Sequence, residues 1–237
     1  PWGSRTAADD LLVEKLRSMI TLILLLVFLV VVLASWFMGL WSNLVTITVL
    51  LLSGLIATNY FEPLAAYLDK PVPGGPAAIG TLDTFTYLLD MIAFWAVFLV
   101  AMLILRGLTD FMSRHRVQFN FWVEMVGRSI TAIWIGWIFV MISAFSIQLA
   151  PLPPAVVQST PQSGMFLGMA PDRMWIGLMQ SRSRGALSRG RFTQQPRHPD
   201  DVDGNYEPFD SRADLVYRYH SRRVALSQLA TLRVVRN

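Results

Sequence analysis

One carboxylate lies inside an apolar stretch of the chain, and it is the first candidate for chemistry. Asp90 falls about two turns inside a helix that the pattern predicts from Thr84 to Leu105. A carboxylate at membrane depth is costly unless it is paired or hydrated, so it is a functional candidate by default. In the functional interpretation Asp90 binds a proton or a cation. In the structural one it caps a helix or hydrogen-bonds to a Thr or Asn side chain.

Other arrangements that could support catalysis or ligand binding fail on their spacing. A calcium loop starting at Asp201 needs Gly at its sixth position and Glu at its twelfth, where Tyr206 and Arg212 stand. The segment PVPGGPAAIG lacks the Lys-Ser/Thr ending of a phosphate-binding loop. The three histidines are far apart, no Ser-His-Asp arrangement is evident, and there is no cysteine. We therefore expect no enzymatic activity, no metal and no cofactor.

Two long runs without any charged side chain, 18–61 and 129–171, indicate that the chain crosses a membrane. A helix of about 20 apolar residues spans the hydrocarbon core of a bilayer. Trp residues that flank the apolar segments fit the headgroup depth, and prolines mark where the helices stop. The second helix is expected to end before Pro63. The four predicted transmembrane helices are Ser18–Phe37, Leu44–Tyr60, Thr84–Leu105 and Ser129–Leu149.

The expected fold class is all-α, a polytopic membrane protein with a mostly irregular C-terminal tail that ends in a helix. An amphipathic lead-in covers 1–17, a four-helix transmembrane domain covers 18–154, and an Arg-rich soluble tail covers 155–237. The last helix is expected from Arg212 onward, with Ser211 and Asp214 as an approximate capping pair.

Basic residues concentrate in the tail, where twelve of the 18 arginines follow residue 171. Basic segments beside a membrane contact lipid headgroups or an acidic partner. The tail contains no recognisable nucleic-acid-binding module, so nucleic acid is not an expected partner. Lys and Arg residues close to the predicted spans number four on each side, so charge does not decide the orientation. The arginines expected to contact lipid or a partner are Arg114, Arg116, Arg173, Arg218, Arg222 and Arg223.

Three segments resemble the colicin V production protein family, CvpA, whose members are small bacterial inner-membrane proteins with four predicted spans. They are GLWSNLVTITVLLLSGLIATNYFEPLAAYL, then LILRGLTDFMSR at the end of the third span, and NFWVEMVGRSITAIWIGWIF leading to SIQLAPLP. The tail segments MFLGMAPDRMWIGLMQ and PFDSRADLVYRYHSRR resemble those of long-tailed versions from planctomycete-type bacteria.

The resemblance implies a multi-pass protein of the bacterial inner membrane, linked to colicin V export and to envelope stress tolerance. Related four-helix regions anchor extracytoplasmic proteases, which implies that both termini lie outside the cytoplasm and the Arg106–Arg128 loop inside. Two functions stay open. One is a membrane scaffold or accessory subunit, acting with protein partners or as a homo-oligomer within the bilayer. The other is an oligomeric channel or transporter component that uses Asp90.

Overall fold

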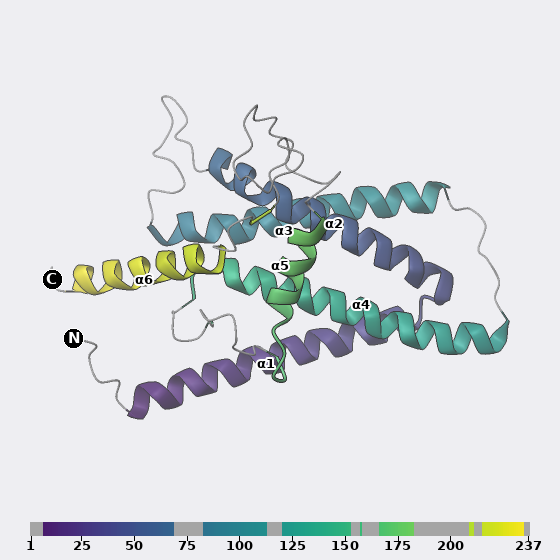
Figure 1. Ribbon diagram of the computed structural model, residues 1–237, viewed down its shortest axis with the longest axis horizontal. Helices are drawn as coiled ribbons and strands as arrows, with labels where there is room; N and C mark the ends of the chain where they lie inside the picture. The colour runs from purple at the N-terminus through teal and green to yellow at the C-terminus, as the bar shows by residue number, and fades with distance from the viewer. Residues whose placement is uncertain are drawn as a thin grey trace, which may run out of the picture.

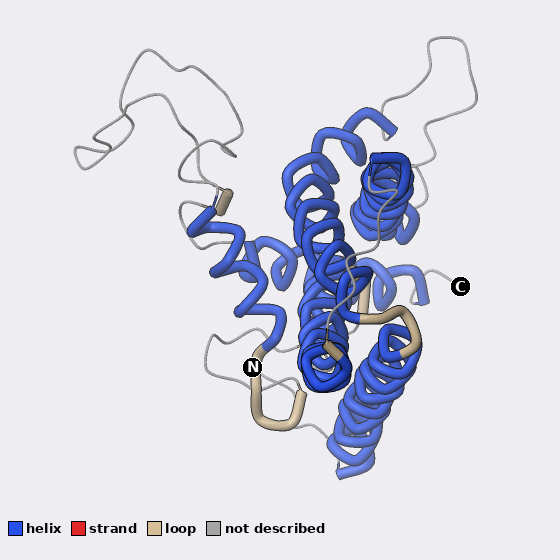
Figure 2. Tube along the Cα trace, turned by 90° about the vertical axis from the view of Figure 1, so that its right-hand side faces the viewer, coloured by secondary structure: helices blue, strands red, loops and turns tan. Residues whose placement is uncertain are grey.

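The structure is a computed structural model, described for residues 7–68, 83–112, 120–152, 157, 166–182, 209–210 and 215–234. Within these ranges it is all-α, as predicted, apart from one isolated antiparallel bridge between Phe166 and Met169 (Figures 1 and 2). Four long helices lie along the long axis of the molecule, α5 crosses them, and α6 lies at the end where α1 begins (Figure 1). The helices are α1 (Ala7–Trp36), α2 (Leu40–Leu68), α3 (Asp83–Met112), α4 (Phe121–Leu149), α5 (Pro171–Arg182) and α6 (Leu215–Val234).

The four long helices are long and apolar enough to cross a membrane, which confirms the predicted number of spans. Large apolar side chains are exposed along all four of them, and α1 exposes the largest share of its surface. Such a surface is unfavourable in water and is solvated by lipid tails. The candidate spans are Glu14–Trp36, Leu40–Leu68, Leu88–Met112 and Phe121–Leu149.

Each long helix extends beyond the segment that predicts it. The described part of the amphipathic lead-in, residues 7–17, and the first span form one continuous helix, α1. The prediction that the second helix ends before Pro63 is wrong, because α2 continues through it to Leu68. Pro63 removes one backbone hydrogen bond from the helix. Phe61 and Ala65, on either side of it, are buried in the core, and this packing holds the helix together across the proline.

The other two spans are longer than predicted because their polar ends are satisfied within helices. α3 continues past Leu105, where the Arg106 Nε donates to Asp110 at 3.2 Å in a pair spaced i,i+4. α4 begins at Phe121 and not at Ser129. Both helices therefore continue through the charged residues next to their apolar segments.

The core lies where α2, α3 and α4 meet. α4 packs against α1, α2, α3 and α5, and α2 packs against α3. One ring from each of the three helices, Phe61, Phe94 and Phe145, contacts the other two edge-on, with centroids 5.3 to 6.2 Å apart. This arrangement is the favourable one for buried aromatic pairs. The rings hold the three helices in register near the end of the bundle where α6 lies.

The opposite end of the bundle is closed by a tight turn between α1 and α2. Gly39 adopts a φ of +85°, which favours glycine, and allows the chain to reverse. The first N–H groups of a helix have no partner within it. Glu124 of α4 supplies an acceptor for the first N–H of α2: its Oε1 accepts a hydrogen bond from the Leu40 N–H at 2.7 Å. Asn43 adds a buried hydrogen bond from its Nδ2 to the Thr131 Oγ1 at 3.1 Å, so α2 and α4 are fixed together at this end.

Candidate functional site

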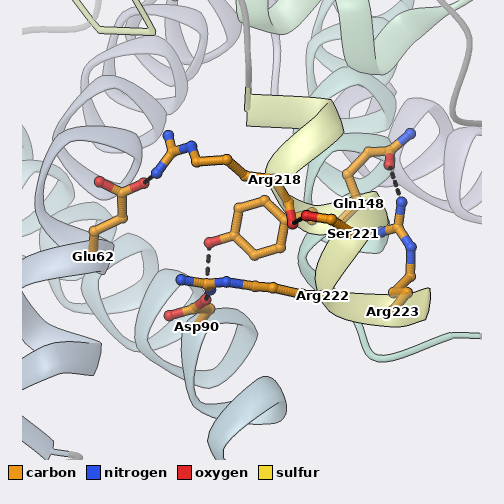
Figure 3. A network of polar contacts seen from close by, with 8 residues as sticks. Glu62, Asp90, Gln148, Arg218, Ser221, Arg222 and Arg223 are labelled. Atoms are coloured by element: carbon orange, nitrogen blue, oxygen red, sulfur yellow. Dashed lines mark hydrogen bonds and ion pairs between the residues drawn. The ribbon is translucent and has the colours of Figure 1, made fainter. Parts of the chain in front are cut away.

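Asp90 contacts the tail and not the neighbouring spans. Its Oδ2 accepts a hydrogen bond from the Tyr219 hydroxyl at 2.9 Å and from the Arg222 Nη1 at 2.6 Å (Figure 3). The two donors lie three residues apart on α6, so one face of that helix presents both. The Arg222 guanidinium also lies 5.1 Å from the centre of the Tyr219 ring. The expectation of a Thr or Asn partner is wrong, because the donors to the carboxylate are a Tyr and an Arg of the last helix.

The carboxylate is nearly enclosed and its main partner is not. The Asp90 side chain is 13% exposed, whereas that of Arg222 is 48% exposed. Burial and then the charge of Asp90 raise the pKa of Tyr219, so its hydroxyl stays protonated and remains a hydrogen-bond donor. A buried carboxylate is strongly destabilising when its countercharge is removed. Arg222 and Tyr219 therefore make the position of Asp90 tolerable only while α6 is in place.

Two further arginines of α6 reach other long helices (Figure 3). The Arg218 Nη1 lies 3.4 Å from the Glu62 Oε1 of α2, in a long and partly exposed pair whose contribution to stability is small. Arg223 points to the other side, where its Nη1 donates to the Gln148 carbonyl of α4 at 2.7 Å. Burial lowers the pKa of Arg223 to about 10, which still leaves it charged at neutral pH. Together with the contact to Asp90, α6 thus joins α2, α3 and α4.

The other described tail helix, α5, is anchored by a tryptophan. Trp175 is fully buried, and its Nε1 donates to the Thr58 Oγ1 of α2 at 3.1 Å. The indole ring lies directly over Gly54, where a Cβ would come within 2.5 Å of it. Glycine at this position lets the ring approach the α2 backbone. The position of α5 across the bundle, seen in Figure 1, follows from this contact.

Gln148 at the end of α4 connects the two tail helices. Its side-chain Nε2 donates to the Asp172 Oδ2 of α5 at 2.9 Å, while its backbone carbonyl accepts a hydrogen bond from the Arg223 Nη1 of α6. Asp172 is buried and also accepts from the Arg173 Nε at 3.1 Å. A buried polar network is stabilising when its members have partners. Gln148 therefore couples the placement of α5 to that of α6.

The structure brings four of the candidate residues together: Asp90, Arg218, Arg222 and Arg223. Arg173 lies on α5 and pairs with Asp172. Arg114 and Arg116 lie outside the described residues, as do Ser211 and Asp214, the expected capping pair of the last helix. The first described residue of α6 is Leu215, whose N–H donates to the Asp210 Oδ1 at 3.1 Å, and the expected start at Arg212 also lies outside the described residues.

Sequence reasoning named Asp90 and Arg222 but missed Tyr219, which bonds to the same carboxylate, the buried Trp175, and α5 itself. A signal for α5 was present, since Asp172, Trp175, Ile176 and Met179 are spaced i, i+3, i+4 and i+7 and are all buried on one face. Thr58 and Gln148 carry no such signal. They are single polar residues in apolar helices, and only their partners in the tail distinguish them.

In the described part of the chain the site offers little chemistry beyond attachment. No group of three or more His, Cys, Asp or Glu residues there could hold a metal ion. A groove of about 440 Å³ between α2 and α3 has a purely apolar lining and so lacks any acid, base or nucleophile. The groove is lined by Ile56, Leu64, Ala96, Val97, Val100, Ala101, Ile104 and Leu105.

One protein-family model matches the part of the chain that contains most of these helices. The family model described as colicin V production protein matches residues 20–171, well over half of the 237-residue chain. The match ends at the first residue of α5. Asp90, Gly54 and Thr58 therefore lie within the matched part, while Trp175, Tyr219 and Arg222 lie beyond it. No curated protein and no solved structure matches the chain.

Proposed function

The chain belongs to the colicin V production protein family, and on that premise we propose that it is a non-enzymatic scaffold or accessory subunit of the bacterial inner membrane. Its four long apolar helices make it a multi-pass membrane protein. Both termini lie outside the cytoplasm in this proposal. The observation that carries the scaffold role is the attachment of α5 and α6 to the long helices through Trp175 and Asp90.

The contacts of Asp90 support a scaffold because its carboxylate is already hydrogen-bonded within the protein. Its Oδ2 has two donors, and the donors come from a helix outside the spans. A carboxylate that anchors a helix gives the tail a fixed position against the membrane. Arg218 and Arg222 keep nearly half of their side chains exposed although both are paired. The attached tail thus presents a basic surface that suits an acidic segment of a protein partner.

The alternative is a channel or transporter component, and one observation supports it. α2 buries a row of small and polar residues, and the hydroxyl of Ser53 is buried without a partner in the described residues. A hydrophilic path past this row would need Asp90 at its mouth. Because Tyr219 and Arg222 occupy the carboxylate, such a path would open only after α6 had moved away. We therefore rank this function second.

Purification in mild detergent tests the scaffold role. We expect the full chain to elute with a second protein, or with further copies of itself, in a defined ratio. Asp90→Ala should lose that companion while remaining monodisperse, because the basic surface depends on α6 being attached. Gly177→Ala is the matched control, since a Cβ at this position on α5 meets nothing within 4 Å. A clean monomer for the wild type, or a companion that both variants retain equally, would count against the proposal.

A further inference from the structure

The end of the bundle opposite the tail carries Arg128, which forms no ion pair within the described residues. The Arg128 guanidinium of α4 lies 5.0 Å from the centre of the Trp36 ring, at the last residue of α1. Trp side chains favour the headgroup depth of a bilayer. Because the first span ends at Trp36 and the second starts at Leu40, the membrane surface passes close to this pair. Three neighbouring aromatic residues at this end, Phe37, Phe121 and Trp122, are largely exposed.

Within the described residues, neither Glu124 nor Asp110 forms an ion pair with Arg128. Glu124, one turn earlier on the same helix, accepts a hydrogen bond from the N-terminus of α2 at 2.7 Å. Asp110 pairs with Arg106, whose two other nitrogens donate to Thr46 and Ser42. The Arg128 Nε is buried and has no acceptor in the described residues. A buried donor without a partner is destabilising, so an acceptor that bonds to this side chain would be stabilising.

We propose that Arg128 and Trp36 form a binding site for the phosphate of an anionic phospholipid. Arginine is suited to this role because its planar group can present two donors to one phosphate. Stacking on Trp36 fixes the plane of the guanidinium. A lipid is favoured over a protein ligand by the position of the site, at headgroup depth and beside exposed aromatic rings. The proposal does not depend on the scaffold function, because no residue of the tail takes part.

Native mass spectrometry of the full chain in detergent tests this site. The protein is titrated with phosphatidylglycerol and, separately, with phosphatidylcholine carrying the same acyl chains. We expect the wild type to retain phosphatidylglycerol preferentially. Arg128→Gln should weaken that retention about fivefold, the effect of one basic residue at an anionic surface. Arg182→Gln is the control, since it removes the same charge from an exposed position on α5 and should leave retention unchanged.

Two further variants keep the test decisive if Arg128→Gln does not fold. Arg128→Lys retains the charge but not the planar fork, and Trp36→Leu removes the stacking ring. Both should weaken retention by less than Arg128→Gln. Equal retention of the two lipids, or wild-type retention in every variant, would overturn the proposal. Competition by soluble glycerol phosphate as effective as that by the lipid would overturn the assignment to a phospholipid, because the membrane would then contribute nothing.

Discussion

Asp90→Ala is expected to release α6 from the long helices. The substitution leaves the buried Tyr219 hydroxyl without its acceptor and Arg222 without its countercharge. A buried group that loses its partner costs about 1–3 kcal/mol. The larger figure for a fully buried ion pair does not apply, because Arg222 is half exposed and can turn to solvent. The equilibrium between attached and released α6 should therefore shift about 5- to 150-fold.

The absence of cysteine from the chain makes this release easy to measure. Val216 is 5% exposed on the face of α6 that meets the core, so Val216→Cys should react slowly with a thiol reagent in the purified protein. Adding Asp90→Ala should accelerate labelling by the factor given above. Glu62→Gln is the control, because its pair with Arg218 is longer and Glu62 is less buried than Asp90, so the substitution should change the rate less than about threefold. An unchanged labelling rate in Asp90→Ala would show that the carboxylate does not hold α6.

The second large effect is expected at the contact between α5 and α2. Trp175→Ala removes a fully buried indole and the donor to Thr58, and truncating a buried Trp typically costs about 3–5 kcal/mol. Gly54→Ala should act on the same contact from the other side. Its Cβ would lie 2.5 Å from the ring and 3.1 Å from the Ile142 Cδ1, so the rigid indole must move. Both variants should detach α5.

Limited proteolysis with trypsin reports that detachment. Arg173 is partly buried and paired with Asp172, so cleavage after it should be slow in the wild type. Trp175→Ala and Gly54→Ala should both speed cleavage at this bond. Gly177→Ala, on the same helix but in open space, should slow it or leave it unchanged, since alanine favours a helix over glycine by about 1 kcal/mol. Equal cleavage rates in all four proteins would contradict the packing of Trp175.

The transmembrane spans were predictable because the hydrocarbon core of the bilayer requires long apolar helices. Charge-free runs such as 18–61 exclude a soluble fold, whatever their tertiary contacts. The ends of the helices were not predictable in the same way. Pro63 and Glu124 look like boundaries in isolation, yet each is accommodated by a tertiary partner: the burial of Phe61 and Ala65 in one case, and the N-terminus of α2 in the other.

The candidate site was predictable only in part. Asp90 could be identified because a carboxylate inside a span is costly anywhere. Its partners could not, since Tyr219 is 129 residues away and nothing in the local pattern links the two. Residues 155–237 were predicted to be a separate tail because they are rich in charged residues. Local composition contains no information on how a segment packs. Trp175 of that segment is buried against Gly54, so a single aromatic residue brings a charged segment onto an apolar helix.

We propose that Asp90 anchors the tail and takes no part in an ion path. Proton flux into liposomes that contain the purified full chain tests it most directly, with wild type and Asp90→Asn compared at equal protein density. Asparagine keeps the shape of the side chain and removes its charge. We predict flux at the level of empty liposomes for both proteins. Flux above that level in the wild type that is lost in Asp90→Asn would contradict the claim and establish the channel function in its place.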